Sequence, residues 1–233
     1  MTTPLIILSH RKDQYLPETL ASIRLNLIGD YYPVVVDDSG DEEHRDWLSQ
    51  QANLPVFSVA GGRNAGYLEA MERVWEVATF WCKDQQEETF LFWEEDFLLT
   101  RPVHLDRVQG VLTAHSNLAQ LNFQRQAVYN IERRLGYMES HQRRGYNLHR
   151  LTHKSTPWVS RTRPFTTNPG LFHRGILEVE WPSREEADEV TGGAEPAMSV
   201  RLERSGWLFG WYGPWNTTSI NHVGVEMKSG TGY

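Results

Sequence analysis

Short apolar runs that alternate with helical patterns dominate the first hundred residues of the chain. Four runs are continuous, as expected of strands buried on both faces of a sheet: 5–8, 34–36, 56–59 and 90–93. Helices are expected between them, over 16–27, 42–51 and 68–78. Strands that alternate with helices and short turns predict an α/β fold whose central sheet is mostly parallel and flanked by helices.

The second half of the chain is less regular. Its pattern predicts a helix over 105–115, a strand over 118–123, an extended segment over 164–172, a helix over 197–205 and a strand over 207–212. The Gly-rich tail from Lys228 is expected to be flexible. No repeat or low-complexity linker divides the sequence, so we expect a single domain over 1–233.

Composition narrows the class of protein. With 233 residues, 39% of them hydrophobic, the chain can bury one substantial core. No run approaches the roughly 20 apolar residues that span a bilayer, and no signal-peptide pattern follows Met1. The single cysteine, Cys82, lies in an apolar helical pattern, which favours a buried structural thiol. We therefore expect a cytoplasmic protein without disulfides or a membrane segment.

Charge is unevenly distributed along the chain. The segment 121–165 contains nine Lys/Arg and two Glu, a net of +7. Because the whole chain carries −7, the remainder carries −14. Such asymmetry is typical of either an anionic partner for one surface or a solvated basic face.

Carboxylates follow two of the predicted strands. Asp37 and Asp38 end the second strand, and Glu94, Glu95 and Asp96 end a later one. Ligands of open α/β sheets bind at the carboxyl ends of strands. Glu94 and Asp96 would share one side of an extended chain. A hard divalent cation that also holds substrate phosphates needs one or two such carboxylates, so the triplet is a candidate metal site.

The order of these motifs resembles the GT-A glycosyltransferases, closest to family 2: Asp-Asp-Ser-Gly at 37–40, Asn-Ala-Gly at 64–66 before a helix, and Glu-Glu-Asp at 94–96. The resemblance implies a nucleotide-sugar-binding half over 1–100 and an acceptor-binding half over 101–233. It assigns the donor's base or ribose to Asp37 or Asp38. The donor-side residues that it implies are Asp37, Asp38, Asn64, Gly66 and Glu95. The triplet takes the position of the family's DXD motif, with Asp96 the firmer metal ligand and Glu94 replacing its first Asp.

Three matches in the second half extend the resemblance to about Gly224. The segment 167–174 resembles the small-residue turn beside the acceptor, where Asn168 lies. Gly-Ala-Glu-Pro at 193–196 resembles the helix start that carries the catalytic base, here Glu195, with Pro196 replacing the expected Asp. His222 belongs to a C-terminal His-x-Gly that supplies a further metal ligand in some relatives.

The function that this resemblance implies is metal-dependent, inverting transfer of a sugar from a nucleotide sugar, UDP-linked by preference, to an acceptor hydroxyl. A divalent metal, Mn²⁺ or alternatively Mg²⁺, would stabilise the leaving diphosphate. Glu195 would take the proton of the acceptor hydroxyl. A nucleotidyltransferase and a non-catalytic nucleic-acid or carbohydrate-binding module are the alternatives.

The acceptor is left open by the sequence. Basic and aromatic residues are interleaved in the second half, and the acceptor-side candidates are Asn168, Trp158, Trp211, Arg143 and Arg144. The Arg and Lys residues that are interleaved with Phe123, Tyr129, Tyr137, Tyr146 and Trp158 could bind a phosphodiester backbone, and the aromatic rings could stack on bases. One candidate acceptor is therefore a modified base in DNA, which must be extruded from the duplex. The compartment would then be the bacterial or phage-infected cytosol. Saccharide, lipid-linked and protein acceptors are the alternatives.

Overall fold

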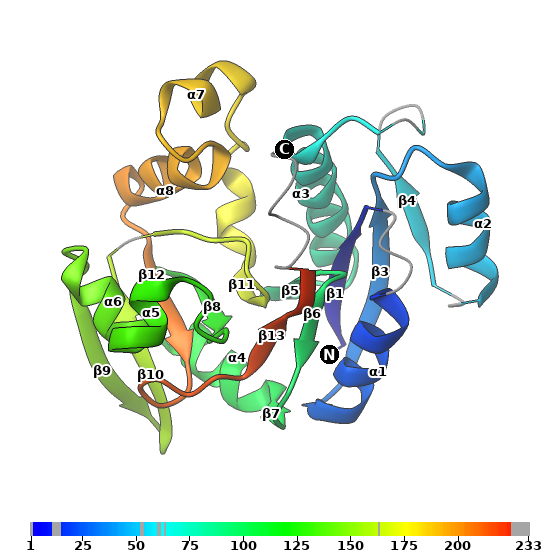
Figure 1. The fold of residues 1–233 in the computed structure, drawn as a ribbon. Coiled ribbons are helices and arrows are strands. Elements are labelled where there is room, and N and C mark those ends of the chain that lie inside the picture. Colours follow the sequence, from blue (N-terminus) through cyan, green and yellow to red (C-terminus); the bar gives the residue numbers. More distant parts are fainter. Residues whose placement is uncertain are drawn as a thin grey trace.

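A nine-stranded sheet runs through the whole protein (Figure 1). The computed structural model describes residues 2–10, 15–51, 54–59, 62, 64–162 and 164–224. The sheet strands, in spatial order, are β4 (Val56–Ser58), β3 (Tyr31–Asp37), β1 (Thr3–Ser9), β5 (Thr89–Glu94), β11 (Gly170–His173), β8 (Leu118–Phe123), β12 (Leu208–Tyr212), β10 (Thr156–Arg161) and β9 (Leu148–His153). Strands β11 and β10 run opposite to the other seven. The expected mostly parallel sheet is confirmed.

Helices cover both faces of this sheet, as the continuous apolar runs require. Ile6 and Val34 face α3 (Tyr67–Asp84) and α8 (Ala194–Arg204) in one hydrophobic cluster. The alternate residues of the same strands, Leu5 and Val35, face the other cluster. That cluster contains α1 (Leu16–Asn26), α2 (Glu42–Gln51) and α4 (Leu105–Ala114). Successive side chains of a strand point to opposite faces, so one apolar run supplies both cores.

The remaining elements lie at the edges and ends of the sheet. Two small pairs flank it: β13 (Ile220–His222) with β6 (Phe97–Leu99), and β2 (Leu27–Ile28) with β7 (Val103–His104). The short helices are α5 (Asn130–Leu135), α6 (Tyr137–Arg143), α7 (Arg184–Glu189) and the 3₁₀ helix η2 (Arg174–Glu178). Helices α5 and α6 and the β9–β10 hairpin fill the basic segment, for which the sequence predicted no elements.

Several expected boundaries differ from those of the structure. Only residues 170–172 of the expected extended segment 164–172 pair as a strand, which continues to His173. Helix α8 begins at Ala194 rather than at residue 197, because Gly193 (φ +81°) caps the helix and Pro196 fits its first turn. The Gly-rich tail from Lys228 lies outside the described residues.

Cys82 is buried, as expected, and burial raises the pKa of its thiol to about 12. Within the described part of the chain, no helix is both long enough and apolar enough to cross a bilayer.

Candidate active site

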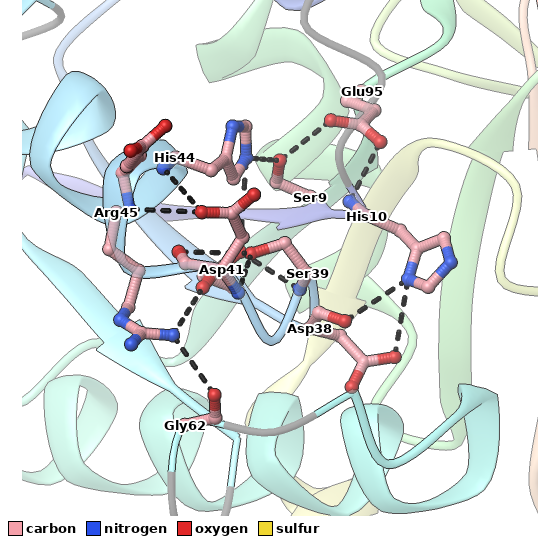
Figure 2. A network of polar contacts seen from close by, with 11 residues as sticks. Ser9, His10, Asp38, Ser39, Asp41, His44, Arg45, Gly62 and Glu95 are labelled. Carbon is pink, nitrogen blue, oxygen red and sulfur yellow. Dashed lines mark hydrogen bonds and ion pairs between the residues drawn. The ribbon is translucent and has the colours of Figure 1, made fainter.

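The carboxyl ends of the parallel strands β1, β3 and β5 lie at one edge of the sheet and bring polar residues together (Figure 2). Glu95, directly after β5, accepts hydrogen bonds from Ser9 Oγ (2.6 Å) and from the backbone N of His10 (2.7 Å). Glu95 was expected at the donor site. Its side chain ties the ends of β1 and β5 together, a contact that the sequence did not predict.

The two aspartates after β3 have different surroundings. Asp37 is 1% exposed, accepts a bond from the backbone N of Ser39 (3.0 Å) and lies 3.5 Å from Arg45 Nη1. Asp38 accepts a bond from the backbone N of Ala65 (2.9 Å), and its Oδ2 lies 3.5 Å from His10 Nδ1. Asp37 is therefore held within the turn and against α2, while Asp38 joins the loop before α3 to the end of β1.

His10 and Asn64 belong to the same group of polar residues. The pKa of His10 is raised by the hydrogen bond to Asp38. Asn64 Oδ1 accepts a bond from the backbone N of Gly66 (3.1 Å), and Gly66 (φ +86°) is the N-cap of α3. Asp38, Asn64 and Gly66, predicted from motifs far apart in the sequence, thus lie on connected loops. In the sequence, only the position of His10 directly after the first strand indicated that it could belong to this site.

The acidic triplet does not continue as an extended chain. Glu94 ends β5, a turn at residues 95–96 follows, and β6 begins at Phe97. The expectation that Glu94 and Asp96 share one side of a strand is therefore wrong. Asp96 is 1% exposed, and its Oδ2 lies 3.2 Å from Nε2 of His222. The ring of His222, on β13, stacks on Phe97 at 4.2 Å.

The Asp96–His222 pair was tested for its fit to a divalent metal. No group of three or more His, Cys, Asp and Glu side chains gathers anywhere in the described ranges, so a closed protein cage is absent there. A carboxylate beside an imidazole suits Mn²⁺, and an ion held by two side chains keeps positions for phosphate oxygens. Gly224 lies against the same carboxylate, where any Cβ would collide with Asp96 Oδ2. These residues fit a metal that is shared with a ligand.

A cavity of about 700 Å³ is lined by residues from distant parts of the chain. Glu94, Phe97 and His222 line it, together with Asn168 and Glu195. Residues that the resemblance assigned to the metal, the acceptor turn and the base therefore share one cavity.

Glu195 is fixed at the start of α8 by the turn before β11. Its Oε1 accepts hydrogen bonds from the backbone N of Thr167 (2.6 Å), from Thr166 Oγ1 (3.3 Å) and, at very short range, from Thr167 Oγ1. Thr167 Oγ1 also lies 2.6 Å from the hydroxyl of Tyr67 and 3.4 Å from Glu94 Oε1. Thr167, which the sequence did not single out, links the candidate base to the acidic triplet.

The acceptor-side candidates separate into three groups. Asn168 and Arg144 line the cavity, whereas Arg143 is exposed outside it. Trp158 and Trp211 are 4% and 0% exposed and pack in the core, so they cannot present a ring face to a sugar. The expectation for these two tryptophans is corrected accordingly.

Two residues that the sequence did not assign to the site also line this side of the cavity, His141 and Arg161. Burial lowers the pKa of His141 to about 4, and its Nδ1 lies 2.8 Å from the backbone O of Tyr137. His141 is therefore neutral at pH 7.

No protein-family profile and no curated protein sequence matches the chain. Solved structures do match. TarS of S. aureus has a TM-score of 0.57 at 13% identity, over 96% of this chain and 37% of TarS. The mannosyltransferase PcManGT from Pyrobaculum calidifontis, in complex with GDP-Man and Mn²⁺, has a TM-score of 0.58 at 14% identity, over 95% of this chain and 56% of PcManGT. GalNAc-T7 with UDP, GalNAc and Mn²⁺ has a TM-score of 0.57 at 12% identity, over 95% of this chain and 43% of GalNAc-T7.

These likenesses establish the fold, and the expected GT-A fold is confirmed. The chain spans between 37% and 56% of the length of these three proteins. A CMP:2-keto-3-deoxy-manno-octonic acid synthetase complexed with CTP also matches, with a TM-score of 0.51 at 11% identity over 94% of both chains.

Proposed function

We propose that the protein is a metal-dependent, inverting glycosyltransferase that moves a sugar from a UDP-sugar to an acceptor hydroxyl. One observation carries the proposal: Glu94, His222 and Glu195 line a single cavity, and Thr167 Oγ1 contacts both Glu94 and Glu195. The likeness to TarS solved with UDP and with UDP-GlcNAc, and to GalNAc-T7 solved with UDP, supports a uridine nucleotide.

Asp96 and His222 would hold the metal, with Glu94 facing the same cavity. Bound there, Mn²⁺ or Mg²⁺ would neutralise the charge that develops on the leaving diphosphate. Asp38, with His10 and the Asn64–Gly66 loop, would bind the nucleoside. The turn at Asp37 and the hydrogen bonds that Glu95 accepts from Ser9 and His10 would orient these loops.

Glu195 would act as the general base. The hydrogen bonds from Thr166 and Thr167 all end on Oε1, which leaves Oε2 without a partner among the described residues. Oε2 would accept the proton of the acceptor hydroxyl while the hydroxyl oxygen attacks the anomeric carbon. A single displacement from the side opposite the diphosphate inverts that carbon. Asn168, beside Thr167, would contact the acceptor.

The test is UDP release from a panel of UDP-sugars with Mn²⁺, with and without chelator. Asp96→Asn should abolish metal-dependent turnover and weaken Mn²⁺-dependent UDP binding, because it removes the ligand charge while keeping its shape. Asp106→Asn, an exposed change of the same kind on α4, should leave both intact. Full activity of Asp96→Asn, or activity that survives chelation, would refute the metal-bridging role.

The same assay separates the main alternative. The likeness to a synthetase complexed with CTP, over 94% of both chains, favours nucleotidyl transfer as the second candidate. Pyrophosphate release from a nucleoside triphosphate in the presence of a sugar would identify that reaction. UDP release from a UDP-sugar identifies glycosyl transfer.

For the acceptor, we propose DNA that carries a hydroxylated base as the first polymer to test. Arg133 and Arg134 are exposed on α5, and Arg144 lies at the cavity itself. Cations around a cavity would attract a phosphodiester backbone. A base must leave the stack to place its hydroxyl near Glu195. Saccharide, lipid-linked and protein pools are screened beside DNA for incorporation of labelled sugar.

A further inference from the structure

A fully buried arginine lies in the wall of the cavity on the acceptor side. Arg161, the last residue of β10, is 2% exposed, and its guanidinium carbon lies 3.8 Å from the centre of the Trp211 ring. The same residue lines the cavity that contains Glu195. A buried charge costs several kcal/mol unless it is paired, so the partner of this cation is the central question.

Within the described residues, no carboxylate forms an ion pair with Arg161. Its Nη2 donates to the amide oxygen of Asn122 (2.8 Å), and its Nε has no hydrogen-bond partner. The carboxylate of Glu195 interacts with Arg161 only through longer-range electrostatics. Burial lowers the pKa of Arg161 to about 10, so Arg161 is protonated at neutral pH.

Arg125 lines the same cavity and, unlike Arg161, is paired with a carboxylate. It makes two bonds of 2.9 Å to the carboxylate of Glu132. Glu132 is itself buried, so this pair is complete without a ligand. Arg161 has no equivalent carboxylate.

A second cation comes from a different element. Arg144, which follows α6, is exposed, lines the cavity and lies over the ring of Tyr129 at 5.9 Å. A guanidinium offers planar pairs of N–H donors that match the oxygens of a phosphate or a carboxylate. Both guanidinium groups line the same cavity, and neither forms an ion pair with a carboxylate of the described residues, so they suit an anion from outside the protein.

We propose that this wall is an oxyanion subsite for the acceptor. The molecule whose hydroxyl receives the sugar also carries a phosphate or carboxylate group, and that group binds Arg161 and Arg144. Binding of the anion near Glu195 would position the acceptor hydroxyl beside the general base, and such positioning lowers the entropic cost of the reaction. The inference rests on the proposed function, because it names the chemistry of the acceptor for the same cavity.

The experiment fills the donor site with UDP and Mn²⁺ and then titrates inorganic phosphate or acetate, with calorimetry and thermal shift as readouts. Wild type should bind at least one of the two anions, and the one bound distinguishes a phosphate from a carboxylate. Arg161→Met should weaken binding of that anion at least about tenfold, the scale of a lost charged hydrogen bond. Met keeps an apolar chain against Trp211, and such replacements of buried charge are often tolerated.

Arg144→Ala is the second variant, because an exposed side chain can be removed without risk to folding. It should also weaken anion binding, whereas the neighbouring Arg143→Ala, outside the cavity, removes the same charge and should bind like wild type. UDP affinity should be equal in all four proteins.

Failure of wild type to bind either anion would overturn the subsite. Anion binding as tight as that of wild type in Arg161→Met or in Arg144→Ala would overturn it as well. A loss of UDP affinity in Arg161→Met would also overturn it and assign the residue to the donor. Failure of wild type to bind UDP with Mn²⁺ is a separate result that contradicts the proposed function. Anion binding can still be measured in that case without nucleotide.

Discussion

At the scale of single residues, Thr167 joins the candidate base to the acidic triplet. Its backbone N and hydroxyl both reach Glu195, and the hydroxyl also meets Tyr67 and Glu94. A base whose Oε1 is held by several donors has a fixed orientation, so Oε2 has a defined direction for its proton. This arrangement makes Glu195 the residue on which the proposed chemistry can be tested most directly.

Glu195→Gln should lower kcat about a hundredfold or more, the scale of a lost general base, because an amide cannot take the proton. The donor KM should change little, since the nucleoside is proposed to bind near Asp38. Steady-state kinetics with the donor and acceptor found by screening measure both. Glu185→Gln, an exposed change on α7, is the matched control. Unchanged kcat with weaker donor binding would make Glu195 a binding residue instead.

Sequence reasoning found the charged residues of this site better than their partners. Carboxylates after buried strands predicted Asp38, Glu94 and Asp96 because parallel strands end at one edge. The sequence could not reveal Thr167, because a threonine before a strand is common and its role depends on Glu195, 28 residues away. It also failed for Trp158 and Trp211, since composition does not separate core tryptophans from exposed ones.

At the scale of elements, β11 positions the turn that holds Glu195. This strand lies between β5 and β8 and runs against both. Its first residue, Gly170, follows the segment with Thr166, Thr167 and Asn168. A Cβ at Gly170 would lie 2.6 Å from the backbone O of Leu121 and 2.7 Å from Cα of Asn122. Close approach of β8 therefore requires glycine at the end of the turn.

Gly170→Ala should destabilise the protein by roughly 1–3 kcal/mol, because rigid backbone rather than a flexible side chain must move. Denaturant unfolding measures this change. Gly110→Ala is the control, since nothing lies within 4 Å of a Cβ there. Gly110 is inside α4, so alanine should stabilise it by up to about 1 kcal/mol. Equal stability of Gly170→Ala and wild type would contradict the close packing of β11 on β8.

Most of the elements that the sequence predicted have a clear apolar pattern. Strand β8 has the expected bounds, and α1 and α4 each end one residue earlier than expected. Helix α2 also has the expected bounds, although its residues are mostly polar. Strand β9 was not predicted because four of its six residues are polar and all six are half-exposed or exposed at the edge of the sheet. Helices α5 and α6 have six and seven residues, too few to show a helical period.

At the scale of the whole molecule, the basic segment is divided between the interior and the surface. Arg125 and Arg161 line the cavity, where Arg125 is paired with Glu132 and Arg161 is buried. Arg133 and Arg134 are exposed on α5. The charge excess counted from the sequence therefore overstates the cations that can meet a polymer. Only the exposed ones can release counterions from DNA.

Replacing Arg133 and Arg134 with Ala should reduce the slope of log K against log salt for DNA binding by about two, near one for each lost phosphate contact. Filter binding or fluorescence anisotropy over a range of salt measures the slope. The Arg24→Ala, Arg107→Ala double variant removes the same charge from α1 and α4 and should keep the slope. Absence of DNA binding at low salt would end the proposal of a DNA acceptor, since electrostatic attraction is strongest there.

The distance along the chain between Asp96 and His222 has a consequence for biosynthesis. The two residues are 126 positions apart, and His222 reaches Asp96 only because β13 pairs with β6. During translation, residues 1–100 leave the ribosome well before residue 222 is made. A nascent chain can therefore fold β1, β3 and β5 before His222 is present. Under the proposed function, the metal site would be complete only after β13 pairs with β6, so an incomplete chain would not consume the nucleotide sugar.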